Sequence, residues 1–169
     1  MTLWSTRKPP WLICLLALGP FAAFAPAPAH AVGSASCTLS VTSLAFGQYV
    51  PSRSSPSDFT ATINLVCFAS GTTPVPILGT IALIGSPGSF ARELTDGGHR
   101  LRYQLFLDPA RTIPWGDGSG DTRTKSISGV VGLTSPLRET LTVYGRILAR
   151  QADAAVGNYT DQITVVLNY

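Results

Sequence analysis

The chain has 169 residues, of which 12% are charged and 45% hydrophobic, whereas about a quarter of the residues in a typical soluble domain are charged. The formal net charge is +3 at pH 7, to which Arg7 and Lys8 contribute, and the other basic residues are scattered along the chain. A nucleic-acid-binding protein needs a basic patch that replaces counterions along the phosphate backbone. The sequence therefore excludes nucleic acid as a partner and suits a protein that packs against neighbours.

The N-terminal segment has the layout of a secretory signal peptide. Arg7 and Lys8 precede an apolar run at residues 11–18, and the triplet Ala29-His30-Ala31 fits the small-residue rule for cleavage. We expect residues 1–31 to be the signal, although cleavage after Ala25 would also fit, and residues 32–169 to be one secreted domain. A membrane anchor is the alternative, but prolines interrupt the apolar run well short of the roughly 18 residues that cross a bilayer. No membrane span is expected after the signal is removed.

The first strands of the expected domain carry its two cysteines. Residues 37, 39 and 41 alternate onto one face of a first strand, and residues 61, 63, 65 and 67 alternate onto one face of a second. An even pair of cysteines in an exported protein is read first as a disulfide. Because Cys37 and Cys67 point the same way as the core residues, we expect a buried bridge between these two strands.

Further strands are expected along the rest of the chain. Residues 77–84 are nearly continuous apolar sequence, which favours a central strand covered on both faces, and residues 100–107 alternate clearly before a turn-rich stretch. Candidate strands follow at residues 125–131, 141–147 and 159–169. Seven or so strands with frequent turns predict an all-β, immunoglobulin-like Greek-key sandwich.

The last expected strand reaches the C-terminal residue itself. Ile163, Val165, Leu167 and Tyr169 share one face. An apolar strand of this kind with no polar tail presents backbone donors and acceptors to a neighbouring chain. The other interpretation is that the strand simply pairs inside its own sheet.

Residues that could do chemistry are few. His99 is the single histidine after residue 31 and lies in a glycine-rich turn, which is typical of a solvated loop. Two thiols are too few for a zinc site, and the run Asp117, Ser119 and Asp121 lacks the terminal glutamate of a calcium loop. We therefore expect no catalytic residues, no metal and no cofactor.

Trp115 could be an exposed aromatic that binds a sugar or a surface, but packing in the core is the favoured interpretation because tryptophan buries a large area.

Several ordered phrases together resemble the spore coat U domain family, over almost the whole of residues 32–169. They are residues 46–49, the Cys37 and Cys67 pair, Arg92, and residues 101–108, 115–118, 143–147 and 157–169. This resemblance implies a subunit or adhesin of an archaic chaperone-usher pilus, with an immunoglobulin-like fold that lacks its final strand. A periplasmic chaperone would fill the resulting groove first and a neighbouring subunit's N-terminal strand would fill it later, after passage through an outer-membrane usher to the cell surface. The C-terminal strand, with Ile163, Val165, Leu167 and Tyr169, would be the strand-pairing interface.

One departure from the polymerising members of that family concerns the segment before Cys37. Only five small residues, 32–36, lie between the expected cleavage site and Cys37, whereas a donor strand needs roughly ten residues with alternating apolar side chains. We therefore predict a subunit that accepts a donor strand but offers none, placed at a fibre tip or chain end and involved in adhesion or biofilm. The alternative is a free-standing secreted coat-like or carbohydrate-binding sandwich that does not polymerise.

Overall fold

The computed structural model divides the chain into two units, residues 1–30 and 31–169, and describes residues 33–43, 46–85, 92–151 and 154–169 of the second. The expected signal peptide, residues 1–31, lies outside the described residues. Every described element of regular structure is a strand. Among these residues there is no helix long and apolar enough to cross a membrane.

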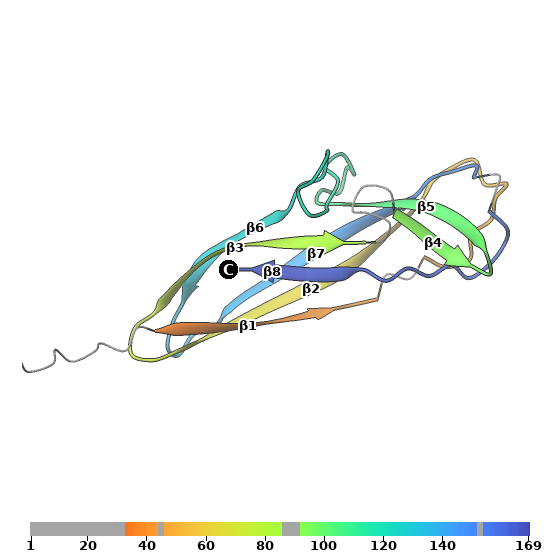
Figure 1. Cartoon of the computed structure of the whole chain (residues 1–169). Coiled ribbons are helices and arrows are strands. Elements are labelled where there is room, and N and C mark those ends of the chain that lie inside the picture. The colour runs from red at the N-terminus through yellow and green to blue at the C-terminus, as the bar shows by residue number, and fades with distance from the viewer. Residues whose placement is uncertain (1–32, 44–45, 86–91, 152–153) are drawn as a thin grey trace, which may run out of the picture. The chain divides into compact units, whose positions relative to one another are not determined.

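Eight strands form two antiparallel sheets (Figure 1). The five-stranded sheet has the order β1-β2-β7-β5-β4, and the three-stranded sheet has the order β6-β3-β8. The strands are β1 (Ser34–Val41), β2 (Ser57–Ser70), β3 (Val75–Ile84), β4 (Arg92–Asp96), β5 (His99–Phe106), β6 (Lys125–Val131), β7 (Leu137–Ile147) and β8 (Thr164–Asn168). The predicted all-β, immunoglobulin-like sandwich is confirmed.

The core lies between the two sheets and is built from the alternating faces that the sequence predicts. Ile63 and Leu65 of β2 and Ile81 and Leu83 of β3 are almost completely buried in one apolar cluster. Burial of such side chains contributes about 25 cal/mol per Å² of apolar surface. Burial of the inward-facing apolar side chains therefore holds the two sheets together.

Three strands differ from the expectation. β4 was not predicted. The expected strand from Tyr159 begins only at Thr164, and the segment before β8 pairs with the rest through the isolated bridge between Thr95 and Thr160. β3 is the central strand of its sheet, but the expectation that both of its faces are covered is wrong, because Leu78 on its outer face is 79% exposed. A run of apolar residues cannot by itself show which face a second layer covers.

Gly145 allows one close approach in the five-stranded sheet. It lies directly opposite Phe59 in the β2–β7 register, and a Cβ atom at this position would overlap the Phe59 ring. The ring of Phe46 packs edge-on against Phe59 with centroids 4.0 Å apart, and also against Tyr103 at 5.2 Å. The absence of a side chain at Gly145 thus lets three aromatic rings gather on the inner face of the sheet.

Candidate functional site

Two edge strands of the sandwich, β1 and β8, lie on either side of the candidate site. β1 is the last strand of the five-stranded sheet and pairs with β2, and β8 is the last strand of the three-stranded sheet and pairs with β3 (Figure 1). An edge strand presents backbone N–H and C=O groups that its own sheet does not use. The two edges therefore offer pairing positions to another strand.

The free positions on β1 follow from its register. Cys37 lies directly opposite Cys67 with their Cα atoms 4.0 Å apart, which is the short spacing of a non-hydrogen-bonded pair in an antiparallel ladder. The backbone N–H of Thr42 donates to the carbonyl oxygen of Thr62 at 3.0 Å, so the even-numbered residues are the ones that form hydrogen bonds with β2. The odd-numbered residues of β1 therefore point their N–H and C=O groups away from β2, toward the open edge.

Side chains on the inner faces of both edge strands are only partly covered. Val41 is 51% exposed although it has the same strand parity as the core-facing Cys37 and Leu39. On β8 and the residue before it, Ile163, Val165 and Leu167 pack against the core but are only partly buried. Apolar side chains that face a core normally gain from complete removal from water, so this side of the sandwich has apolar surface left to bury.

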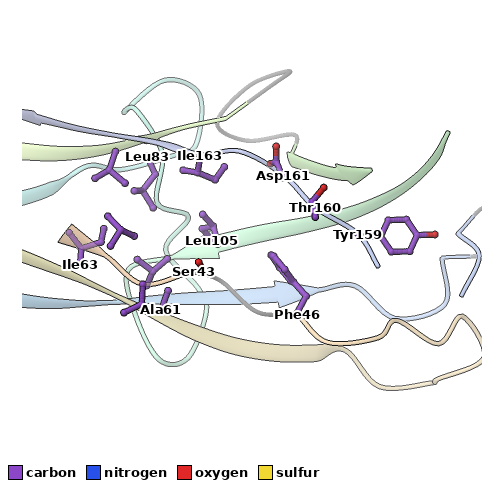
Figure 2. Close-up of a pocket in the computed structure, with 14 residues that line it drawn as sticks. Ser43, Phe46, Ala61, Ile63, Leu83, Leu105, Tyr159, Thr160, Asp161 and Ile163 are labelled. Carbon is purple, nitrogen blue, oxygen red and sulfur yellow. The ribbon is translucent and has the colours of Figure 1, made fainter. Parts of the chain in front are cut away.

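A cavity of about 360 Å³ opens between the two edges. Figure 2 shows Leu83 and Ile163 on one wall and Ala61 and Ile63 on the other, with Tyr159, Thr160 and Asp161 at one end. The wall is mainly apolar, with the following hydrophobic residues: Val41, Phe46, Ala61, Ile63, Leu83, Leu105, Val143, Tyr159, Ile163 and Val165. Its size and lining suit the apolar side chains of an extended segment.

The C-terminal Tyr169 reaches across from one edge to the other. Its hydroxyl oxygen accepts a hydrogen bond of 3.2 Å from the backbone N–H of Cys37, one of the groups that face the open edge of β1. Gly79 lies beneath it on β3, where a Cβ atom would overlap the Asn168 carbonyl oxygen and come within 3.0 Å of the Tyr169 Cβ. The chain's own last residue thus takes one pairing position of β1.

Comparison with known proteins agrees with this architecture. A family model described as the Spore Coat Protein U domain matches residues 23–166. The chain belongs to the Spore Coat Protein U domain family. Domains of this family are associated with chaperone-usher pili and are not known as enzymes. A search of curated proteins found no match.

Several of the residues through which the chain resembles Spore Coat Protein U domains line the cavity. Phe46, Leu105, Val143, Tyr159 and Asp161 come from four separate phrases of the sequence and all line it. Sequence patterns alone did not identify them as one site, because they lie far apart in the chain. Their common appearance in those phrases was the signal that could have grouped them.

A buried polar network fixes the chain that leads into β8. The Tyr103 hydroxyl donates to Asp161 Oδ2 at 2.6 Å, and Arg92 Nη2 donates to the carbonyl oxygens of Leu83 at 2.7 Å and Trp115 at 3.2 Å. Burial lowers the pKa of Arg92 below its usual range. Burial, assisted by the hydrogen bond to Asp161, raises the pKa of Tyr103 well above its ordinary value. Sequence analysis did not predict this network, which holds the Asp161 end of the cavity in place.

The predicted site residues fall into three groups. The expected disulfide between Cys37 and Cys67 is present and ties the edge strand β1 to β2. Of the four residues predicted as a strand-pairing interface, Ile163 and Val165 line the cavity, whereas Leu167 and Tyr169 do not. Trp115 is 1% exposed and its Nε1 donates to the Ile81 carbonyl oxygen at 2.9 Å, so the surface-binding alternative for this residue is wrong and the favoured packing interpretation describes it.

No metal-binding group occurs in the part of the chain that the structure describes, where three or more His, Cys, Asp or Glu side chains never cluster as ligands would. Asp117, which the sequence analysis considered for calcium, accepts hydrogen bonds from Ser119 through its N–H at 3.0 Å and its hydroxyl at 2.6 Å. Asp commonly closes turns in this way. The carboxylate thus has a structural use within its own loop.

Proposed function

We propose that this Spore Coat Protein U domain is a subunit of a chaperone-usher-type surface fibre, and that it accepts a β-strand from another protein between β1 and β8. The observation that carries the proposal is the apolar opening between two free strand edges, with core-facing side chains half-buried on both sides. A strand laid between the two edges would pair with both sheets and cover those side chains. On this reading the sandwich is incomplete until the strand arrives.

The chemistry of recognition would be that of β-strand addition. Main-chain hydrogen bonds to the odd-numbered residues of β1 and to the open edge of β8 would supply the pairing, and alternate apolar side chains entering the cavity would supply the register. Along β8 the contacts would come from Val165 and Leu167, with Ile163 just before it and Tyr169 just after it. No proton transfer or covalent step is part of such a function.

The partners follow from the family context. A periplasmic chaperone would supply the strand during transit, an outer-membrane usher would export the subunit, and a neighbouring subunit would supply the final strand at the cell surface. The segment expected to be a signal peptide, residues 1–31, would direct the chain into the periplasm. We place the mature protein in a surface pilus or fimbrium on this basis.

A position at the fibre tip or chain end extends the proposal. Ser34, Ala35 and Ser36, which precede Cys37, are already paired with Ser70, Ala69 and Phe68 in the chain's own sheet. These residues belong to β1 and cannot at the same time donate a strand to another subunit. A subunit that accepts but does not donate ends a fibre, where it is placed for adhesion or biofilm formation.

One observation favours the alternative of a free-standing secreted protein that does not polymerise. Tyr169 already accepts the hydrogen bond of the Cys37 amide, so the chain itself covers part of the β1 edge. A single hydroxyl satisfies one donor, however, whereas the cavity next to Val41 and Val165 remains open. The donor-strand function is therefore the better supported of the two.

Thermal unfolding of the purified full chain, as its host cell processes it, tests the proposal. A donor peptide from a companion subunit, present at about 100 times its dissociation constant, should add about 2.7 kcal/mol to the free energy of unfolding. For a domain of this size that raises the melting temperature by roughly 5 to 10 °C. The control is the same peptide with its apolar residues moved by one position, because that shift turns them to the opposite face of the strand.

Either of two results would contradict the donor-strand function. Equal stabilisation by both peptides would show that binding does not depend on which face of the donor strand carries the apolar side chains. Indifference to every donor strand and to the chaperone, with a monodisperse and stable monomer, would favour the free-standing alternative.

A further inference from the structure

A second cavity, of about 510 Å³, lies where the β4–β5 hairpin meets the segment after β7. We call it the cationic pocket and define it by His99, Arg100, Arg102, Leu148, Arg150 and Gln151, which line it. Its volume falls in the range of small-molecule sites, about 300 to 1,000 Å³. It shares no lining residue with the cavity between β1 and β8.

Positive charge is concentrated in this pocket. Three arginines and one glutamate line it, although residues 32–169 together carry ten basic and nine acidic side chains. Glu93 lies opposite Arg102 in the strand register but forms its ion pair with Arg100, whose Nη1 is 2.6 Å from Glu93 Oε2. Among the described residues, neither Arg102 nor Arg150 has a carboxylate within ion-pair distance. Within the described part of the chain, these two guanidinium groups thus line one cavity without an ion pair of their own.

The backbone around the pocket is held by a single side chain. Gln151 Oε1 accepts from the backbone N–H of Arg102 at 2.6 Å, and its Nε2 donates to the carbonyl oxygens of Arg102 at 2.8 Å and Leu148 at 3.1 Å. These bonds attach the loop after β7 to the edge of β5. They also use the polar atoms of the Gln151 amide, so the side-chain donors left in the pocket are mainly cationic.

Arg150 and the hairpin turn have unusual backbone conformations. Arg150 has a φ of 54°, in the left-handed region that costs a non-glycine residue roughly 1 to 2 kcal/mol. Gly97 and Gly98, with φ of 53° and 98°, form the two-residue turn that places His99 and Arg100 at the start of β5. Strain kept in a residue that lines a cavity often accompanies binding.

From this arrangement we propose that the cationic pocket binds the acidic groups of a polysaccharide, carboxylate or sulfate. A guanidinium group is planar and matches such oxyanions with paired hydrogen bonds. Leu148, which is 51% exposed, supplies an apolar wall on which the body of a sugar ring can rest. A neutral sugar would leave the charges of Arg102 and Arg150 unpaired, and nucleic acid would require a longer row of cations than one cavity provides.

This function is separate from strand acceptance. Because the two cavities have no residue in common, a sugar in the cationic pocket does not compete with a donor strand between β1 and β8. The subunit could therefore hold an acidic polysaccharide while it is joined to its partner. A failure of either proposal leaves the other standing.

The test measures binding of the full chain, purified as its host cell processes it, to three immobilised polymers at about 0.1 M salt, where the Debye length is about 10 Å. Dextran sulfate carries sulfate groups, polygalacturonate carries carboxylates, and dextran is neutral. We expect binding to one or both acidic polymers and none to dextran, and the stronger of the two identifies the preferred oxyanion. Arg102→Gln and Arg150→Gln should each weaken binding about five- to tenfold, as loss of a charge-assisted contact does.

A matched control separates a site from general attraction. Arg138→Gln removes the same charge from an exposed residue on β7 that does not line the pocket, and it should change binding less than about twofold. Unfolding temperatures of the variants confirm that each is folded. An equal loss in Arg138→Gln, binding to dextran as strong as to the acidic polymers, or no binding to any acidic polymer would each overturn the proposal.

Discussion

Filling the cavity between β1 and β8 should stabilise the free protein and at the same time weaken strand binding. Ala61 lines the cavity and is 4% exposed, so leucine at this position would extend into the open space. Burying three more carbon atoms contributes about 2.4 kcal/mol at about 0.8 kcal/mol each, and ordering the side chain costs about 0.5 to 1 kcal/mol. The net gain of about 1.5 kcal/mol corresponds to a rise of roughly 3 to 6 °C in melting temperature.

The same substitution acts on the donor strand in the opposite direction. The leucine would occupy space that a donor side chain otherwise fills, and a loss of about 1.5 kcal/mol weakens binding by roughly tenfold. Both effects can be measured on Ala61→Leu by differential scanning calorimetry and by titration with the donor peptide. A stabilised protein with weaker peptide binding is the expected result.

Ala154→Leu is the matched control. Ala154 is 5% exposed, close to the value for Ala61, but does not line the cavity, so the extra atoms must force neighbours apart at a cost of about 1 to 3 kcal/mol. If Ala61→Leu destabilises the protein as much as Ala154→Leu does, the cavity is not open space in the free molecule. If Ala61→Leu is stabilised but binds the peptide unchanged, the donor strand does not enter the cavity.

Three further predictions follow from the same region. Reduction of the Cys37–Cys67 bridge, which joins residues 30 positions apart, should lower the free energy of unfolding by about 3.5 kcal/mol. Chemical denaturation with and without reductant measures this loss, and an unchanged denaturation midpoint would contradict the prediction. Tyr169→Phe removes the acceptor of the Cys37 amide, so it should lower the free energy of unfolding by at most about 1 kcal/mol. It should also speed association of the donor peptide in stopped-flow measurements. Slower association would contradict the inference that Tyr169 covers the edge of β1. Because the pKa of Tyr103 is raised in the folded protein, only the unfolded state loses the Tyr103 proton near pH 10. The contribution of Tyr103 to the free energy of unfolding should therefore be complete below about pH 10 and decrease as the pH rises above it. In Tyr103→Phe, denaturation curves should lose that part of the alkaline slope, and a slope identical to that of the parent protein would refute the assignment.

Local alternation determined much of this fold from the sequence. The inward faces of β2 and β5 follow from a period of two, because neighbouring side chains in any strand point to opposite sides. The same period places Cys37 and Cys67 on the core side, where the even pair of cysteines can form the expected disulfide. β4 escaped that reasoning because its buried positions are Arg92 and Leu94. A charged residue breaks an apolar pattern, and the burial of Arg92 depends on partners from distant segments, among them the carbonyl oxygens of Leu83 and Trp115.

Which surfaces are open was decided by the tertiary structure. Alternation assigns Ile163 and Val165 to one face but cannot say whether another strand covers that face, since coverage depends on how the two sheets end. Burial of Trp115 likewise depends on the Ile81 carbonyl oxygen, which comes from a distant strand. The meeting of Arg102 with Arg150 in one pocket requires β5 and the segment after β7 to lie together. Sequence patterns determine which side chains of a strand share a face. Long-range packing determines which strand edges and cavities remain open to other molecules.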